Sequence, residues 1–122
     1  MKLGDLIQSA DWKAEKHVPV IDAPEKVEAD VPFTVKVMVG KEIHHPNTQE
    51  HHIRWISLYF KPEGSKFAFQ VGSAEFSAHG EASAFCEPFC KFSLKVNGPG
   101  TLIAESLCNI HGLWESSQEL AV

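Results

Sequence analysis

Long apolar runs are absent from this 122-residue sequence. No stretch approaches the roughly 20 apolar residues that a membrane-spanning helix needs, and residues 1–10 hold no run long enough for a signal peptide. We therefore expect a cytoplasmic protein with no membrane partner. Repeats, low-complexity blocks and linkers are also missing, so we expect a single domain over residues 1–122.

Positive charge and cysteine are both scarce. Eleven lysines and arginines against 16 aspartates and glutamates give a formal net charge of −5, which offers no electrostatic support for binding nucleic acid. Three cysteines do not make a paired disulfide framework. Thiols in such a chain are more often metal ligands, redox groups or core residues, which fits a reducing compartment.

Helical periodicity over more than two turns is missing, and apolar residues alternate with polar ones instead. Alternation is clearest over 33–39 and 90–96, and a β-branched and aromatic run covers 52–60. Further strands are expected over 17–21, 67–71, 101–107 and 114–122, with a short helical turn within 3–9. About seven short strands predict an all-β, immunoglobulin-like antiparallel β-sandwich.

Two glycine-containing segments are expected to end or join these strands. Gly72 is expected to close the strand over 67–71. The turn over 97–100 has the sequence Asn-Gly-Pro-Gly, a strong turn signal. We expect it to join the strands before and after it as a hairpin in one sheet.

Histidine is the abundant residue, with seven in the chain. Four of them lie in the polar segment 43–52 between two expected strands, and a Cys-x-x-His pair, Cys108 and His111, lies on an expected turn near the C-terminus. Imidazole and thiolate together suit a transition metal rather than calcium or magnesium. The alternative is that these are exposed loop histidines and a buried structural thiol.

Four separated motifs resemble the superoxide reductase family, neelaredoxin type. The motifs are EKHVPVI at 15–21, GKEIHHPNT at 40–48, EHHIR at 50–54 and CNIHGLWE at 108–115. They occur in the family's order over nearly the whole chain. The four-cysteine N-terminal domain of the larger desulfoferrodoxins has no counterpart here, so the chain resembles the single-iron form.

The resemblance implies a mononuclear non-haem iron that cycles between Fe2+ and Fe3+. Its ligands would be four imidazoles in a plane and one axial thiolate, namely His17, His45, His51, His111 and Cys108. It also implies one-electron reduction of superoxide to hydrogen peroxide, a rubredoxin-like electron donor and a homotetramer.

Two neighbouring residues take further roles from the resemblance. Glu15 would be a possible sixth ligand in the ferric state, and Lys16 would attract the anionic substrate. Electrostatic focusing of that kind raises association rates by roughly 10-fold to 1,000-fold. His44 and His52 match no ligand position and are expected to lie beside the ligands or in solvent, and His79 has no expected ligand role.

Other readings of the same residues remain open at this point. A cupredoxin would also use His and Cys, but its usual downstream axial methionine is missing, since the only methionines are Met1 and Met38. Structural zinc is closed at four ligands, usually with more cysteines. Superoxide dismutation at the same iron is a further alternative. Cys90 is expected in the core, and Cys86 has no matching metal motif.

Overall fold

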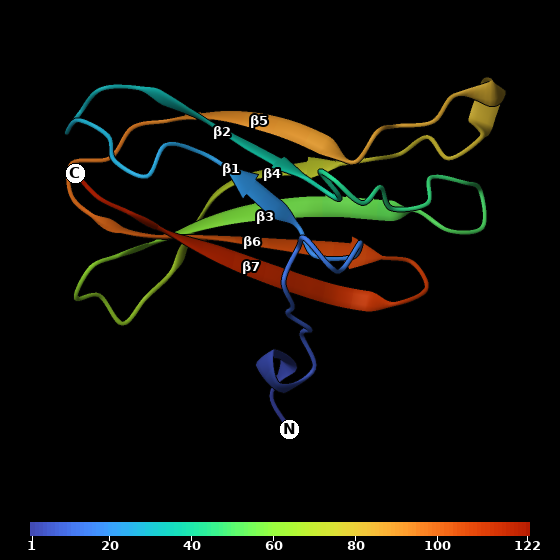
Figure 1. The fold of residues 1–122 in the computed structure, drawn as a ribbon, viewed down its shortest axis with the longest axis horizontal. Coiled ribbons are helices and arrows are strands. Elements are labelled where there is room, and N and C mark those ends of the chain that lie inside the picture. The colour runs from blue at the N-terminus through green and yellow to red at the C-terminus, as the bar shows by residue number, and fades with distance from the viewer.

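The computed structural model describes all 122 residues and contains seven strands and two single-turn helices (Figure 1). Both helices are far too short to cross a membrane. In chain order the elements are η1 (Leu3–Asp5), β1 (Val20–Asp22), β2 (Phe33–Met38), β3 (Ile53–Pro62), β4 (Phe69–Glu75), η2 (Glu81–Ser83), β5 (Phe89–Leu94), β6 (Gly100–Cys108) and β7 (Gly112–Leu120).

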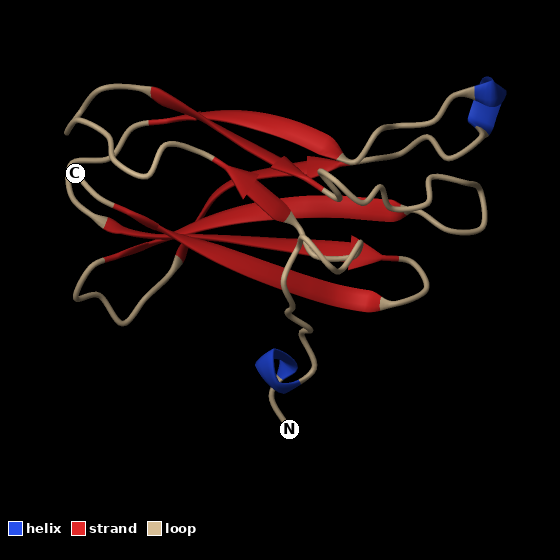
Figure 2. Ribbon diagram, viewed as in Figure 1, coloured by secondary structure: helices blue, strands red, loops and turns tan.

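The strands form two antiparallel sheets (Figure 2). One has three strands in the order β1-β2-β5, and the other has four in the order β4-β3-β6-β7. The core between them is built from alternate residues of the strands, including Val35 and Val37 of β2 and Ile56 and Leu58 of β3. The predicted all-β sandwich is therefore confirmed, and the expected strands match the observed ones within a few residues.

The alternation of buried and half-buried residues is longer in β6 than in any other strand. Every second residue from Gly100 to Cys108 is buried, and the residues between them are half-buried. Leu102 and Ala104 in this row are fully buried core residues. Because side chains alternate across a strand, the same period that buries these two residues also turns the Cys108 side chain inward.

The expected hairpin across residues 97–100 is wrong. β5 pairs with β2, whereas β6 pairs with β3 and β7, so this turn carries the chain from one sheet to the other. A strong turn signal specifies that the chain reverses, but the partner of each strand is set by the packing of the two sheets.

The expected strand end at Gly72 is also wrong, because β4 continues to Glu75. Gly72 pairs with Leu58 inside the sheet, and a Cβ placed on it would lie 2.5 Å from a ring carbon of Phe92. Phe92 belongs to β5 in the opposite sheet. The glycine therefore marks a close approach between the sheets rather than the end of a strand.

The segments that carry the candidate ligands meet at one end of the sandwich. Pairing of Ile53 with Cys108 brings the end of the β2–β3 loop beside the β6–β7 turn, and both lie at the right-hand end of Figure 1. A shift of register between Ile53 and Trp55 marks a bulge where β3 begins. Bulges are common next to functional sites, where they redirect side chains.

Candidate metal centre

Four candidate ligands from three distant segments converge at this end of the sandwich. His17 precedes β1, His45 and His51 lie in the β2–β3 loop, and Cys108 is the last residue of β6. One ligand atom from each lies within 4.8 Å of the other three. Cys108 is 1% exposed, His17 and His45 are buried, and His51 is half-buried.

The fifth candidate, His111, borders this group from the exposed β6–β7 turn. Its Nδ1 lies 3.0 Å from His17 Nε2 and 3.7 Å from Cys108 Sγ. His111 is outside the set of four whose ligand atoms are all mutually close, and it is exposed whereas the thiol is buried. It closes the group on the solvent side.

The four imidazoles are arranged as a quadrilateral. Adjacent ring centroids are 5.0 Å apart for His17 and His45, 4.6 Å for His45 and His51, 5.1 Å for His51 and His111, and 4.5 Å for His111 and His17. The diagonal from His17 to His51 is longer, at 6.1 Å. Four rings in this cyclic order with a thiol beside them can surround a single ion.

In His45, a hydrogen bond at the outer ring nitrogen leaves the inner nitrogen free to bind a metal. His45 Nδ1 donates to the Pro46 carbonyl at 2.7 Å, and His17 Nδ1 lies 2.6 Å from Glu15 Oε1. The Nε2 atoms of His45 and His51 are buried without a partner. An outer N–H held by a carbonyl or carboxylate is the usual arrangement of a metal-binding histidine. The donor set therefore fits a transition metal.

Burial disfavours the protonated forms of His45 and His51. It lowers the pKa of His45 to about 4, although the bond to Pro46 opposes this, and the charge of Lys16 lowers it further. Burial is also the main cause that lowers the pKa of His51. Metal binding needs an unprotonated imidazole, so this part of the site holds two rings in the state that a cation requires.

Neighbouring residues contact Cys108 and His17, two of the candidate ligands. The His111 backbone N–H donates to Cys108 Sγ at 3.4 Å. The indole of Trp114 stacks on the His17 ring, with centroids 5.0 Å apart and an interplanar angle of 18°. Glu15 Oε1 also accepts the His17 backbone N–H at 3.0 Å, and the hydrogen bond from the His17 side chain is the main cause that lowers the pKa of Glu15.

The remaining histidines and cysteines lie outside this group. His44 is exposed, whereas His52 and His79 are both buried and stack on each other. All three cysteines are free thiols. Cys90 is in the core as expected, and burial raises the pKa of its thiol to about 11. Cys86 is half-buried.

Asn109 is a residue of the site that sequence reasoning missed. Its Oδ1 accepts the His52 backbone N–H at 2.8 Å, and its Nδ2 donates to the Glu50 carbonyl at 2.9 Å. Its own backbone N–H donates to the His52 carbonyl at 3.1 Å. Three bonds thus hold the Cys108 turn against both neighbours of His51. The only signal in the sequence was an amide side chain directly after the cysteine.

Known proteins match this chain in both sequence and fold. The Desulfoferrodoxin family matches residues 9–117. Neelaredoxin from Megalodesulfovibrio gigas is 55% identical over 129 residues, covering 100% of this chain and 99% of that protein. Superoxide reductase from Pyrococcus furiosus is 52% identical and covers 97% and 98%. The structure of superoxide reductase (neelaredoxin) from Archaeoglobus fulgidus in the reduced form is 51% identical, with a TM-score of 0.87 and coverage of 96% and 99%.

Replacing Asn109 by alanine is expected to loosen the centre without removing a ligand. Loss of two side-chain hydrogen bonds should lower the free energy of unfolding by about 1–3 kcal/mol. It should also speed metal release to a chelator by roughly 10- to 100-fold. Asn109→Asp keeps the acceptor for the His52 backbone N–H, so its rate of metal release should lie between those of Asn109→Ala and the wild type. Asn97→Ala, in an exposed turn, is the control, and a wild-type release rate for Asn109→Ala would contradict the role.

Proposed function

The chain belongs to the desulfoferrodoxin family and is a superoxide reductase, and we propose that four histidines and one cysteine are the ligands of its mononuclear iron. They are His17, His45, His51, His111 and Cys108. The observation that carries this proposal is the quadrilateral of imidazoles, with two buried and unpartnered Nε2 atoms, beside a buried thiol. Membership of this family excludes the alternative that the chain is a cupredoxin.

The reaction is the one-electron reduction of superoxide to hydrogen peroxide, with uptake of two protons. When bound, ferrous iron supplies the electron and a coordination position for the substrate. Cys108 would hold the iron through its thiolate, and the backbone N–H of His111, 3.4 Å from Sγ, would reduce the electron density that this thiolate donates. We infer that this balance favours departure of peroxide with its O–O bond intact.

Glu15 and Lys16 are proposed to control the approach to the iron. Lys16 places a positive charge beside the imidazoles on a chain whose formal net charge is −5. This local charge attracts an anion that the average charge repels. Glu15 orients His17 through its 2.6 Å contact with Nδ1. Ligation of ferric iron by Glu15 is also proposed, and it would require the carboxylate to leave His17.

The partners, assembly and location of the enzyme are also proposals. We infer that a rubredoxin-like protein re-reduces the iron and that the chain forms a homotetramer. Phe67 lies just before the edge strand β4 and is 66% exposed, and Phe69 is the first residue of β4 and is 56% exposed. These exposed rings support association with other copies of the chain. Three free thiols support a cytoplasmic location. One core shared by both sheets supports a single domain over 1–122.

Replacing Cys108 by serine tests the proposed thiolate ligand. The iron-loaded variant should lose the visible thiolate-to-iron charge-transfer band, because a hydroxyl donates far less electron density than a thiolate. Absorption spectra of the oxidised protein measure this directly. Cys86→Ser is the matched control and should keep the band. An unchanged spectrum for Cys108→Ser would remove the thiol from the ligand set.

The stoichiometry of the reaction separates reduction from dismutation. Mixing pulse-generated superoxide with the ferrous protein should oxidise one iron and yield one hydrogen peroxide for each superoxide consumed. Peroxide yield and iron oxidation are followed in the same experiment. Release of dioxygen, with turnover that needs no electron donor, would identify a dismutase instead.

Removal of the Lys16 charge is expected to slow the encounter with superoxide. Lys16→Ala should lower the second-order rate of oxidation of the ferrous protein by roughly 3- to 10-fold at low salt. The dependence on ionic strength should become shallower, because screening then has less attraction to remove. Lys95→Ala, an exposed lysine just after β5, is the control. Equal rates and salt slopes for Lys16→Ala and wild type would exclude a role for Lys16 in attracting superoxide.

A further inference from the structure

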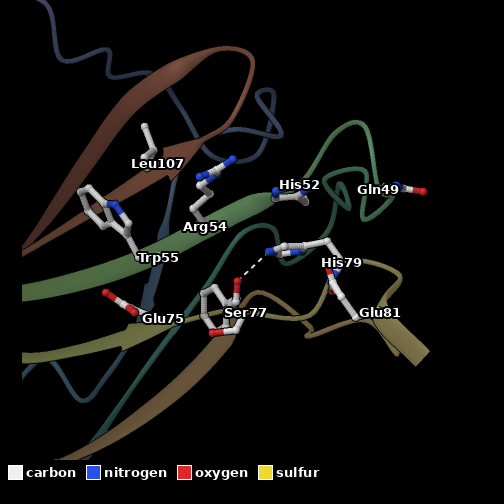
Figure 3. Close-up of a pocket in the computed structure, with 10 residues that line it drawn as sticks. Gln49, His52, Arg54, Trp55, Glu75, Ser77, His79, Glu81 and Leu107 are labelled. Atoms are coloured by element: carbon white, nitrogen blue, oxygen red, sulfur yellow. Dashed lines mark hydrogen bonds between the residues drawn. The ribbon is translucent and has the colours of Figure 1, made fainter. Parts of the chain in front are cut away.

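A second pair of buried histidines, His52 and His79, lies outside the proposed iron ligands. Their rings stack with centroids 3.5 Å apart and an interplanar angle of 8°. His52 is 6% exposed and His79 is 9% exposed. Both line a cavity of about 510 Å³ next to the start of β3, where they lie one above the other in Figure 3. No step of the superoxide reaction uses them.

Each ring has one nitrogen bound to a backbone carbonyl. His52 Nδ1 lies 3.0 Å from the Thr48 carbonyl oxygen, and His79 Nε2 lies 2.6 Å from that of Phe76. A carbonyl oxygen only accepts, so both of these nitrogens carry the proton. The other nitrogens, His52 Nε2 and His79 Nδ1, therefore hold free lone pairs.

Neither free nitrogen has a hydrogen-bond partner, although both are buried. A buried acceptor that is left without a partner is destabilising. His45, in the proposed iron centre, has the same arrangement, with Nδ1 bound to the Pro46 carbonyl and a buried, unpartnered Nε2. Both His52 and His79 thus have one nitrogen bound to a carbonyl and a free lone pair on the other, as metal-binding histidines typically do.

A carboxylate lies beside the pair. Glu81 lines the same cavity, and its Oε2 accepts the His79 backbone N–H at 2.5 Å, which leaves lone pairs on both of its oxygens for a further bond. Arg54 also lines the cavity but makes no hydrogen bond with either ring. In Figure 3 Glu81 lies on the His79 side and Arg54 on the side of β3.

We propose that His52 and His79 form a second transition-metal site, with Glu81 as a carboxylate ligand. Two neutral imidazoles and a carboxylate suit zinc, which accepts nitrogen and oxygen ligands without a redox change. The stacked rings must fan apart to converge on one ion, and the χ2 torsion of histidine is broad enough to allow this. The ion would join the β4–β5 connection to the loop that carries His45 and His51.

Zinc titration of the iron-loaded protein tests this site. Calorimetry with analysis of metal content should find one zinc per chain bound in addition to the retained iron. His79→Gln should weaken this binding by roughly tenfold or more. His44→Gln, which removes an exposed histidine of the same loop, should bind zinc as the wild type does. No zinc beyond the iron, or equal binding by wild type and His79→Gln, would overturn the proposal.

A measurement on the wild-type protein decides the question if His79→Gln does not fold. Crystals of the iron-loaded protein soaked with zinc should show anomalous density at the zinc edge between His52 and His79. Density at other places only, or a water molecule in this position, would refute the site. The charge-transfer band and iron content of the same samples report on the iron centre separately, so failure of one assignment leaves the other intact.

Discussion

The pairing of β3 with β6 is the constraint on which the rest of the site depends. It places Ile53 opposite Cys108, so the end of the β2–β3 loop meets the β6–β7 turn. A slip of one residue would turn every side chain of β6 to the other face and take Cys108 out of the core. Asn109 reinforces this register, because its three bonds to the loop backbone hold the thiol and His51 in a fixed relation.

Burial then sets the chemistry of the candidate ligand atoms. The thiol of Cys108 and the inner nitrogens of His45 and His51 are shielded from water, while His111 is exposed and Lys16 is half-buried. A buried lone pair without a partner is costly, so these atoms are held ready for a cation. The exposed side, where water supplies protons, is where a small anion can arrive.

Much of this architecture follows from sequence periodicity. Alternation over 33–39 and 90–96 correctly predicted two strands, and the histidine-rich loop correctly indicated a metal centre. The hairpin across 97–100 was wrong because sheet membership depends on packing partners far along the chain. The predicted strand end at Gly72 is wrong because the ring of Phe92 from the other sheet is the reason for a glycine there.

By itself, the sequence determined the strand pattern and the choice of nitrogen and sulfur donors, because these depend on residues close together in the chain. Only the tertiary structure decided which histidines meet. His52 follows His51 directly, yet its ring stacks on His79, while His17 contacts His111, which is 94 residues further along the chain. Such contacts depend on strand register and sheet packing, which no local pattern specifies.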